Sequence, residues 1–138
     1  MTEPCIDTSV IIRLVSGDDQ AKQAAAAQLF EDVEHGRLSV AAPETVIADA
    51  VYVLTSPRTY RLARPTVAAA LTRLVRLPHF KVQNRRAVLR ALDLFGTTTR
   101  LDFGDAIIVA VMEQKKRSSV YSYDADFDAF PWITRQEP

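Results

Sequence analysis

The sequence predicts an α/β fold in which a central parallel sheet of four to five short strands is flanked by helices. Two observations predict this class. Short apolar segments alternate with longer segments whose apolar residues recur at helical spacing. Acidic residues also follow several of the short segments, at the strand ends where sites form in parallel sheets. The chain of 138 residues is long enough for one sizeable core, so we expect residues 1–138 to form a single domain.

In the first half of the chain, turn and cap residues separate the predicted elements. Gly17 and Gly36 supply helix C-terminal signals, Asp18-Asp19 supply an N-terminal cap, and Pro43 suits the first turn of a helix. The predicted elements are a buried strand at 5–7, helices at 8–16 and 18–35, a strand at 38–41 and a helix at 43–55.

In the second half, Pro65 opens a helix and Pro78 ends it, and Gly96 closes the next one. The helix at 103–116 is apolar on nearly all sides from Ala106 to Met112, which predicts that it is buried. The predicted elements are helices at 65–77, before Gly96 and at 103–116, with strands at 80–83 and 120–123, a turn at 126–130 and an edge strand at 132–134.

Composition excludes several classes of protein. Apolar residues make up 48% of the chain and charged residues 25%, which is ordinary for a soluble globular protein. The longest apolar run, from Ala106 to Met112, is far shorter than the ~20 residues that cross a bilayer. The start does not resemble a signal peptide, and the lone Cys5 cannot form an internal disulfide. We therefore expect a cytoplasmic protein that does not associate with membranes.

The net charge of zero conceals an uneven distribution. Residues 58–100 hold ten basic residues, nine of them Arg, against the single acid Asp93. One interpretation is a pair of solvated helices; the other is a basic rim that binds a polyanion such as RNA. In the second, Arg85, Arg86 and Arg90 are the candidate RNA-binding residues, because guanidinium groups suit bidentate phosphate contact.

Four acids stand among apolar residues. Asp7 and Asp124 follow predicted strands, Asp105 begins an apolar helix, and Asp49 lies inside one. A carboxylate in apolar surroundings is costly to bury unless something pairs with it, and several carboxylates can share one divalent cation. These four are the candidate catalytic residues. Asp7 and Asp105 are the expected core metal ligands, and Asp49 and Asp124 complete the shell or orient water.

The acids near the two predicted site helices also have structural interpretations. Asp is a preferred helix cap, so Asp7 could cap the helix after it. Ser9 could cap, bind Asp7 or orient a water, and Thr8 is a second supporting candidate. Asp102 stands three residues before Asp105, which is capping-box spacing, and we expect it to be a cap.

The segment from Asp124 has the D-x-D-x-D start of a calcium loop, but Ala129 and Arg135 replace the required Gly and Glu, which excludes an EF-hand. Asp126 remains an auxiliary ligand candidate, and Asp128 is expected to be solvated. His35 and His79 share no ligand spacing with Cys5, so zinc is not expected.

Asp49 competes with Glu44 for the ligand position on the helix at 43–55. An acid in the first turn, like Glu44, is favoured by the helix dipole without any function. Asp49 lies mid-helix among apolar residues, where a poor helix former needs a reason. We therefore expect Asp49 to be the ligand, with Glu44 as the alternative.

Taken in order, these motifs resemble the PIN domain, and within it the VapC-type ribonuclease toxins of toxin–antitoxin pairs. The resemblance spans about residues 6–130. Each motif is weak alone, but the ordered set is fairly specific. The matching segments are Cys5 to Ser9, Pro43 to Leu54 with its internal acid, Asp102 to Ala106, and Tyr121 to Phe127.

This resemblance implies a PIN-like layered fold and an acidic site that binds Mg²⁺ or Mn²⁺ and cleaves single-stranded RNA through a metal-activated water. Carried over to this chain, the ligand positions are Asp7, Asp49, Asp105 and Asp124. The family usually has Glu where this chain has Asp49, whose shorter side chain reaches less far. The resemblance also implies a small antitoxin as partner and a homodimer.

Two other functions compete with the nuclease. A phospho-acceptor receiver domain also gathers acids at strand ends, but it needs a late Lys near them. Lys115 and Lys116 lie at the far end of their helix. A catalytically silent PIN-like binding module is the second alternative, and a metal-dependent nuclease assay separates all three.

Overall fold

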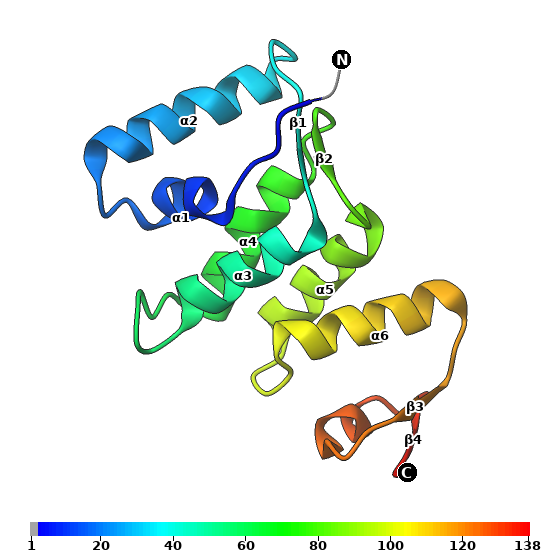
Figure 1. Ribbon diagram of the computed structural model, residues 1–138. Coiled ribbons are helices and arrows are strands. Elements are labelled where there is room, and N and C mark those ends of the chain that lie inside the picture. The colour runs from blue at the N-terminus through cyan, green and yellow to red at the C-terminus, as the bar shows by residue number, and fades with distance from the viewer. Residues whose placement is uncertain (1–2) are drawn as a thin grey trace.

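The computed structural model describes residues 3–138, and helices make up most of that range (Figure 1). The α-helices are α1 (Thr8–Ser16), α2 (Gln20–Glu34), α3 (Glu44–Thr55), α4 (Arg64–Val75), α5 (Arg85–Thr97) and α6 (Phe103–Lys115). The remaining elements are the strands β1 (Val40–Ala42), β2 (Phe80–Val82), β3 (Ser119–Tyr121) and β4 (Thr134–Gln136), and the 3-10 helix η1 (Ala125–Ala129).

The helix boundaries follow local cap chemistry, as the sequence predicts. The Asp19 carboxylate accepts a hydrogen bond from the backbone N–H of Lys22 at 3.0 Å and so caps α2. Gly17 and Gly36, with φ of 66° and 75°, end the chain's first two helices in the left-handed region that glycine adopts without strain. The predicted helices are therefore confirmed to within a few residues.

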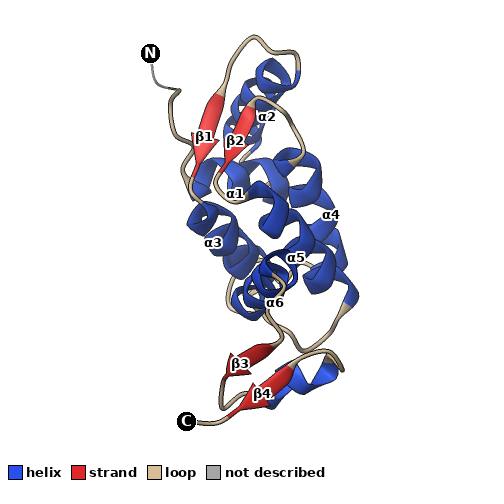
Figure 2. Cartoon of the chain, turned by 90° about the vertical axis from the view of Figure 1, so that its right-hand side faces the viewer, coloured by secondary structure: helices blue, strands red, loops and turns tan. Residues whose placement is uncertain are grey.

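The strands form two separate parallel pairs, β1 with β2 and β3 with β4. Figure 2 shows the two pairs at opposite ends of the helical part of the molecule. The α/β class with parallel strands and flanking helices is confirmed. The prediction of four to five strands in one central sheet is wrong for the described residues, because β3 pairs with β4 instead of joining the β1–β2 pair.

The predicted strand at 5–7 is reduced to one bridge between Cys5 and Ala41. Two backbone hydrogen bonds hold it, from Ala41 N–H to Pro4 O at 2.9 Å and from Ile6 N–H to Ala41 O at 2.8 Å. Ile6 is buried, but Cys5 is exposed, so its predicted burial is wrong. The reason is its edge position: the segment has β1 on one side only.

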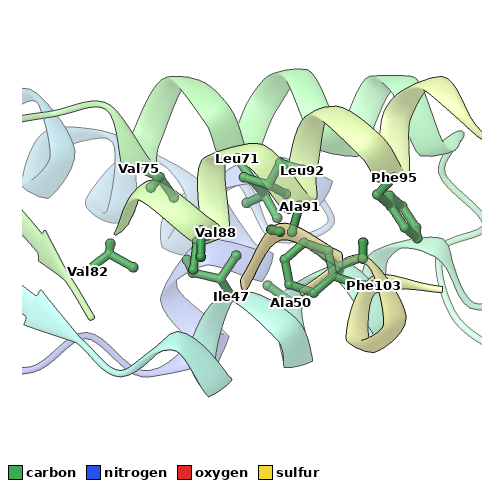
Figure 3. Close-up of a cluster of buried hydrophobic side chains, with 14 of the residues drawn as sticks. Ile47, Ala50, Leu71, Val75, Val82, Val88, Ala91, Leu92, Phe95 and Phe103 are labelled. Atoms are coloured by element: carbon green, nitrogen blue, oxygen red, sulfur yellow. The ribbon is translucent and has the colours of Figure 1, made fainter. Parts of the chain in front are cut away.

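The core lies between α3, α4, α5 and α6 (Figure 3). α4 and α5 approach so closely that a Cβ at Gly96 would lie 2.8 Å from the Cβ of Ala68. α6 buries Phe103 and Val109, but Ile108 is 42% exposed. The prediction that this helix is buried on nearly all sides is therefore wrong, because α6 lies at the edge of the helical layer. In the described range, no helix combines the length and apolarity needed to cross a membrane.

Candidate active site

Four carboxylates gather around the start of α6, and we call Asp102, Asp105, Asp124 and Asp126 the α6 acid cluster. Asp105 lies in the first turn of α6, and Asp124 follows β3 at the start of η1. Burial raises the pKa of the Asp105 carboxyl to about 6, with further contributions from the negative charges of Asp102 and Asp124. Asp105 is thus the acid whose surroundings most disfavour its charge.

Local hydrogen bonds hold the other members of the cluster. Asp102 caps α6 by accepting from the backbone N–H of Asp105 at 2.8 Å, which confirms its predicted structural role. Asp124 accepts from the backbone N–H of Asp126 at 2.9 Å, and the Ser122 hydroxyl accepts from the N–H of Asp124 at 2.9 Å. These bonds orient Asp124 beside the start of α6.

Asp7 lies elsewhere, at the start of α1, where it is exposed. Its carboxylate makes no capping bond and instead accepts from the Ser9 hydroxyl at 2.9 Å, a bond that lowers the pKa of Asp7. Of the three roles considered for Ser9, the hydrogen bond to Asp7 is therefore the one seen. The Thr8 hydroxyl donates to the Val46 carbonyl at 3.4 Å and ties α1 to α3.

The two candidates on α3 differ in what surrounds them. Asp49 is exposed, one turn after Val46, although its sequence neighbours are apolar. Glu44 is half-buried and accepts a hydrogen bond from the Asn84 amide at 3.2 Å, so it links α3 to the start of α5. The carboxylate of Glu44 is thus engaged in the fold, which favours Asp49 as the ligand candidate.

The structure brings Asp105, Asp124 and Asp126 together with Asp102, but it does not gather the full predicted set. Within residues 3–138, no three His, Cys, Asp or Glu side chains stand close enough together to hold one metal ion. The donor chemistry of the α6 acid cluster nevertheless suits a hard cation. All its donors are carboxylate oxygens, and their negative charges repel one another unless a cation neutralises them. A ligand role for any of these acids stays a prediction.

The predicted RNA-binding arginines have unequal surroundings. Arg85 is partly buried and donates to the carbonyl oxygens of Leu77, at 3.2 Å, and Phe80, so its guanidinium supports the loop before β2. Arg90 pairs with Asp93 at 2.8 Å and Glu113 at 3.0 Å. Arg86 is exposed on the same helix. The prediction of RNA contact remains open for all three, and Arg86 is the best placed.

Some acids and aromatic residues differ from expectation. Asp128 is exposed but not merely solvated, because it accepts from Arg135 at 3.0 and 3.2 Å.

Tyr52, Tyr121 and Tyr123 are each more than 70% exposed. These tyrosines could not be recognised as binding candidates from the sequence, since tyrosine in an apolar segment is as typical of a buried strand as of an exposed aromatic patch.

Comparison with known proteins identifies the family of this chain and a similar solved structure. No curated protein matches the chain. Among solved structures, Mycobacterium tuberculosis VapC20, described as a Sarcin-Ricin loop cleaving toxin, is similar at 22% identity and a TM-score of 0.40. The alignment covers 92% of this chain and 94% of that one. The profile of the PIN domain matches residues 5–133, almost the whole chain. The chain therefore belongs to the PIN domain family.

Proposed function

We propose that this chain is a Mg²⁺- or Mn²⁺-dependent endoribonuclease that cuts single-stranded RNA, and that it acts as a VapC-type toxin in the cytoplasm. The observation that carries the proposal is the setting of Asp105 in this PIN-family chain. Asp105 lies beside three further carboxylates, and its pKa is raised to about 6. Strongly perturbed acids of this kind are typical of functional sites.

In this proposal Asp105 and Asp124 would hold the cation near the start of α6, and Asp7 and Asp49 would complete the site from α1 and α3. The bound ion would supply Lewis-acid chemistry, polarising the phosphate and lowering the pKa of a water. Asp105 binds a proton more readily than an ordinary Asp because its pKa is raised, and it would have to be ionised to bind the cation. Asp102 keeps Asp105 in place through the α6 cap, and Ser9 orients Asp7.

Exposed basic and aromatic side chains support an RNA substrate. Arg86 lies exposed on α5, and Arg100 lies 3.9 Å from Asp126 with 85% of its side chain exposed. Tyr123 directly precedes Asp124 and is 73% exposed, so its ring is available to stack on an unpaired base. Stacking of this kind selects single strands, whose bases are free of a duplex.

The geometry disfavours the receiver-domain alternative. Lys115 is the last residue of α6 and Asp105 lies in its first turn. Ten residues of helix separate their backbones by about 15 Å, too far for the Lys to pair with that carboxylate. A catalytically silent binding module is the remaining alternative, and it predicts no metal-dependent cleavage.

An antitoxin would control the enzyme by covering it. A groove of about 850 Å³ lies between α1, α2 and α4, with apolar walls from Leu14, Phe30 and Leu74. Leu14 of α1 contributes to this groove, whereas Leu54 of α3 is fully buried and offers no surface to a partner. We propose that a small antitoxin inserts an apolar segment there, and that the toxin is a homodimer, which light scattering of the purified protein would test.

The decisive experiment is cleavage of single-stranded RNA with and without Mn²⁺, using the wild type, Asp105→Asn and Asp128→Asn. We expect cleavage by the wild type only when Mn²⁺ is present, and loss of at least about a hundredfold in Asp105→Asn. Asp128→Asn is the matched control, because it removes an exposed acid of the same C-terminal segment that lies outside the α6 acid cluster. Metal-independent cleavage, or equal rates in all three proteins, would reject the proposal.

A second experiment tests the toxin role in cells. We expect growth arrest when the chain is expressed alone, relief by Asp7→Asn without loss of folded protein, and relief by co-expression with the neighbouring small open reading frame. Unaffected growth with soluble, folded wild type would favour the silent module or a nuclease of narrow target range. Sequencing the 5′ ends of cellular RNAs after brief expression would identify the cleaved site.

A further inference from the structure

We propose that Arg64 is a positioning residue for the α6 acid cluster: it fixes the segment between α5 and α6, and so the place where α6 begins. The inference rests on the proposed function for the metal-binding role of the cluster. The contacts that connect Arg64 to the start of α6 do not depend on that function. Arg64 is the first residue of α4, more than thirty residues before the segment that it holds.

The guanidinium of Arg64 binds the backbone of this segment at three successive points. Its Nε donates to the carbonyl oxygens of Phe95 at 3.1 Å and Thr98 at 3.0 Å. Its Nη2 donates to the carbonyl oxygen of Leu101 and lies 3.4 Å from the Thr98 hydroxyl. Leu101 directly precedes Asp102, the residue that caps α6. The hydrogen bonds therefore end one residue before the acid cluster starts.

A stack of side chains makes a second connection. The Arg64 guanidinium carbon lies 3.7 Å from the centre of the Phe95 ring, in cation–π geometry. Phe95 in turn packs edge-to-face on Phe103, with ring centres 6.0 Å apart, as their placement in Figure 3 shows. Phe103 is the first residue of α6 and lies two residues before Asp105. Arg64 thus reaches the site helix through side chains as well as through the backbone.

The chemistry requires arginine at this position. Only the planar guanidinium offers several fixed N–H donors together with a flat face for an aromatic ring. A lysine would keep the charge but would not satisfy several carbonyl groups and the ring at once. Burial lowers the pKa of Arg64, and the charge of Asp102 opposes that shift, so Arg64 also places a positive charge behind the cap.

The same chain offers a matched control in Arg85. That residue is also partly buried and also binds two backbone carbonyl groups, those of Leu77 and Phe80, but it supports the loop before β2. Replacing Arg64 or Arg85 with Lys removes the same type of interaction at two different places. A general loss of stability would affect both variants alike.

The experiment compares the wild type, Arg64→Lys and Arg85→Lys by amide hydrogen exchange and by calorimetric titration with Mn²⁺. In Arg64→Lys we expect faster exchange at residues 98–105 and an affinity for Mn²⁺ lower by on the order of tenfold, the usual effect of losing a residue that orients metal ligands. In Arg85→Lys we expect wild-type exchange at 98–105 and wild-type affinity. Variants that fold poorly would be compared as Arg64→Gln and Arg85→Gln.

Two outcomes would overturn the inference: unchanged exchange at 98–105 in both Arg64 variants, or equal losses of Mn²⁺ affinity in the Arg64 and Arg85 variants. Failure of the proposed function gives a different result. In that case the wild type itself would bind no Mn²⁺, whereas the exchange difference between Arg64→Lys and Arg85→Lys would persist and would leave Arg64 as the residue that sets the start of α6.

Discussion

Replacing Asp105 with Asn should stabilise the protein at neutral pH in the absence of metal. The carboxyl of Asp105 has a pKa raised from its ordinary value of 3.8 to about 6, first by burial and then by the charges of Asp102 and Asp124. An acid with a raised folded-state pKa stabilises the folded state fully below its unfolded pKa, near pH 4. That contribution is lost as the pH rises through about 6. Asn stays neutral throughout and carries no such loss.

The size of the effect follows from the pKa. A rise from 3.8 to about 6 corresponds to about 3 kcal/mol at 1.36 kcal/mol per pKa unit. Asp105 is only partly buried, so solvent screening reduces this upper limit to on the order of 1 kcal/mol. For a chain of this length, 1 kcal/mol shifts the melting temperature by roughly 3 to 5 °C.

The assay is thermal unfolding of the wild type and Asp105→Asn in EDTA between pH 5 and 8, with Asp128→Asn as the control. The stability advantage of Asp105→Asn should grow from pH 5 to about 7 and then stay constant. Adding Mg²⁺ should stabilise the wild type, by about 2.7 kcal/mol at a hundred times the dissociation constant, and leave Asp105→Asn unaffected. An advantage for Asp105→Asn that does not depend on pH would refute the electrostatic account of the cluster.

Three further predictions concern packing and the α3 candidates. Gly96→Ala should lower stability, although helix propensity alone favours Ala, because the new Cβ would meet Ala68 at 2.8 Å; chemical denaturation would show the sign. Leu71→Ala should cost about 2 to 5 kcal/mol in the same assay, since Leu71 is fully buried in the core. Asp49→Ala should abolish Mn²⁺-dependent cleavage, whereas Glu44→Ala should retain most of it. The reverse result in that cleavage assay would identify Glu44, at the start of α3, as the ligand.

The helices could be predicted from the sequence because their signals are local. Gly17, Gly36 and the caps at Asp19 and Asp102 act on backbone groups within a few residues, and each is found where the pattern places it. Strand pairing depends on contacts between distant segments, and three-residue strands carry little pattern of their own. The sequence therefore indicated the parallel α/β class but not the division into two strand pairs.

The candidate site shows the same division between local and distant information. The partners of Asp102 and Ser9 are two or three residues away, so the sequence predicted the cap role of Asp102 and included the bond from Ser9 to Asp7 among its alternatives. The structural role of Arg85 was not, because its acceptors are carbonyl groups of Leu77 and Phe80, whose positions depend on the folded chain. Any arginine in a basic segment has the same appearance until its partners are known.

The exposed position of Cys5 allows the wild-type protein to be labelled at a single site near Asp7. Cys5 is the sole cysteine of the chain, its thiol is accessible, and it lies two residues before Asp7. A thiol-reactive fluorophore would therefore label one defined place without any mutation. Paramagnetic Mn²⁺ quenches such a dye only at short range, so an ion held jointly by Asp7 and the α6 acid cluster would dim it. An ion held by the cluster alone would leave the dye bright and would show that Asp7 does not share the ion.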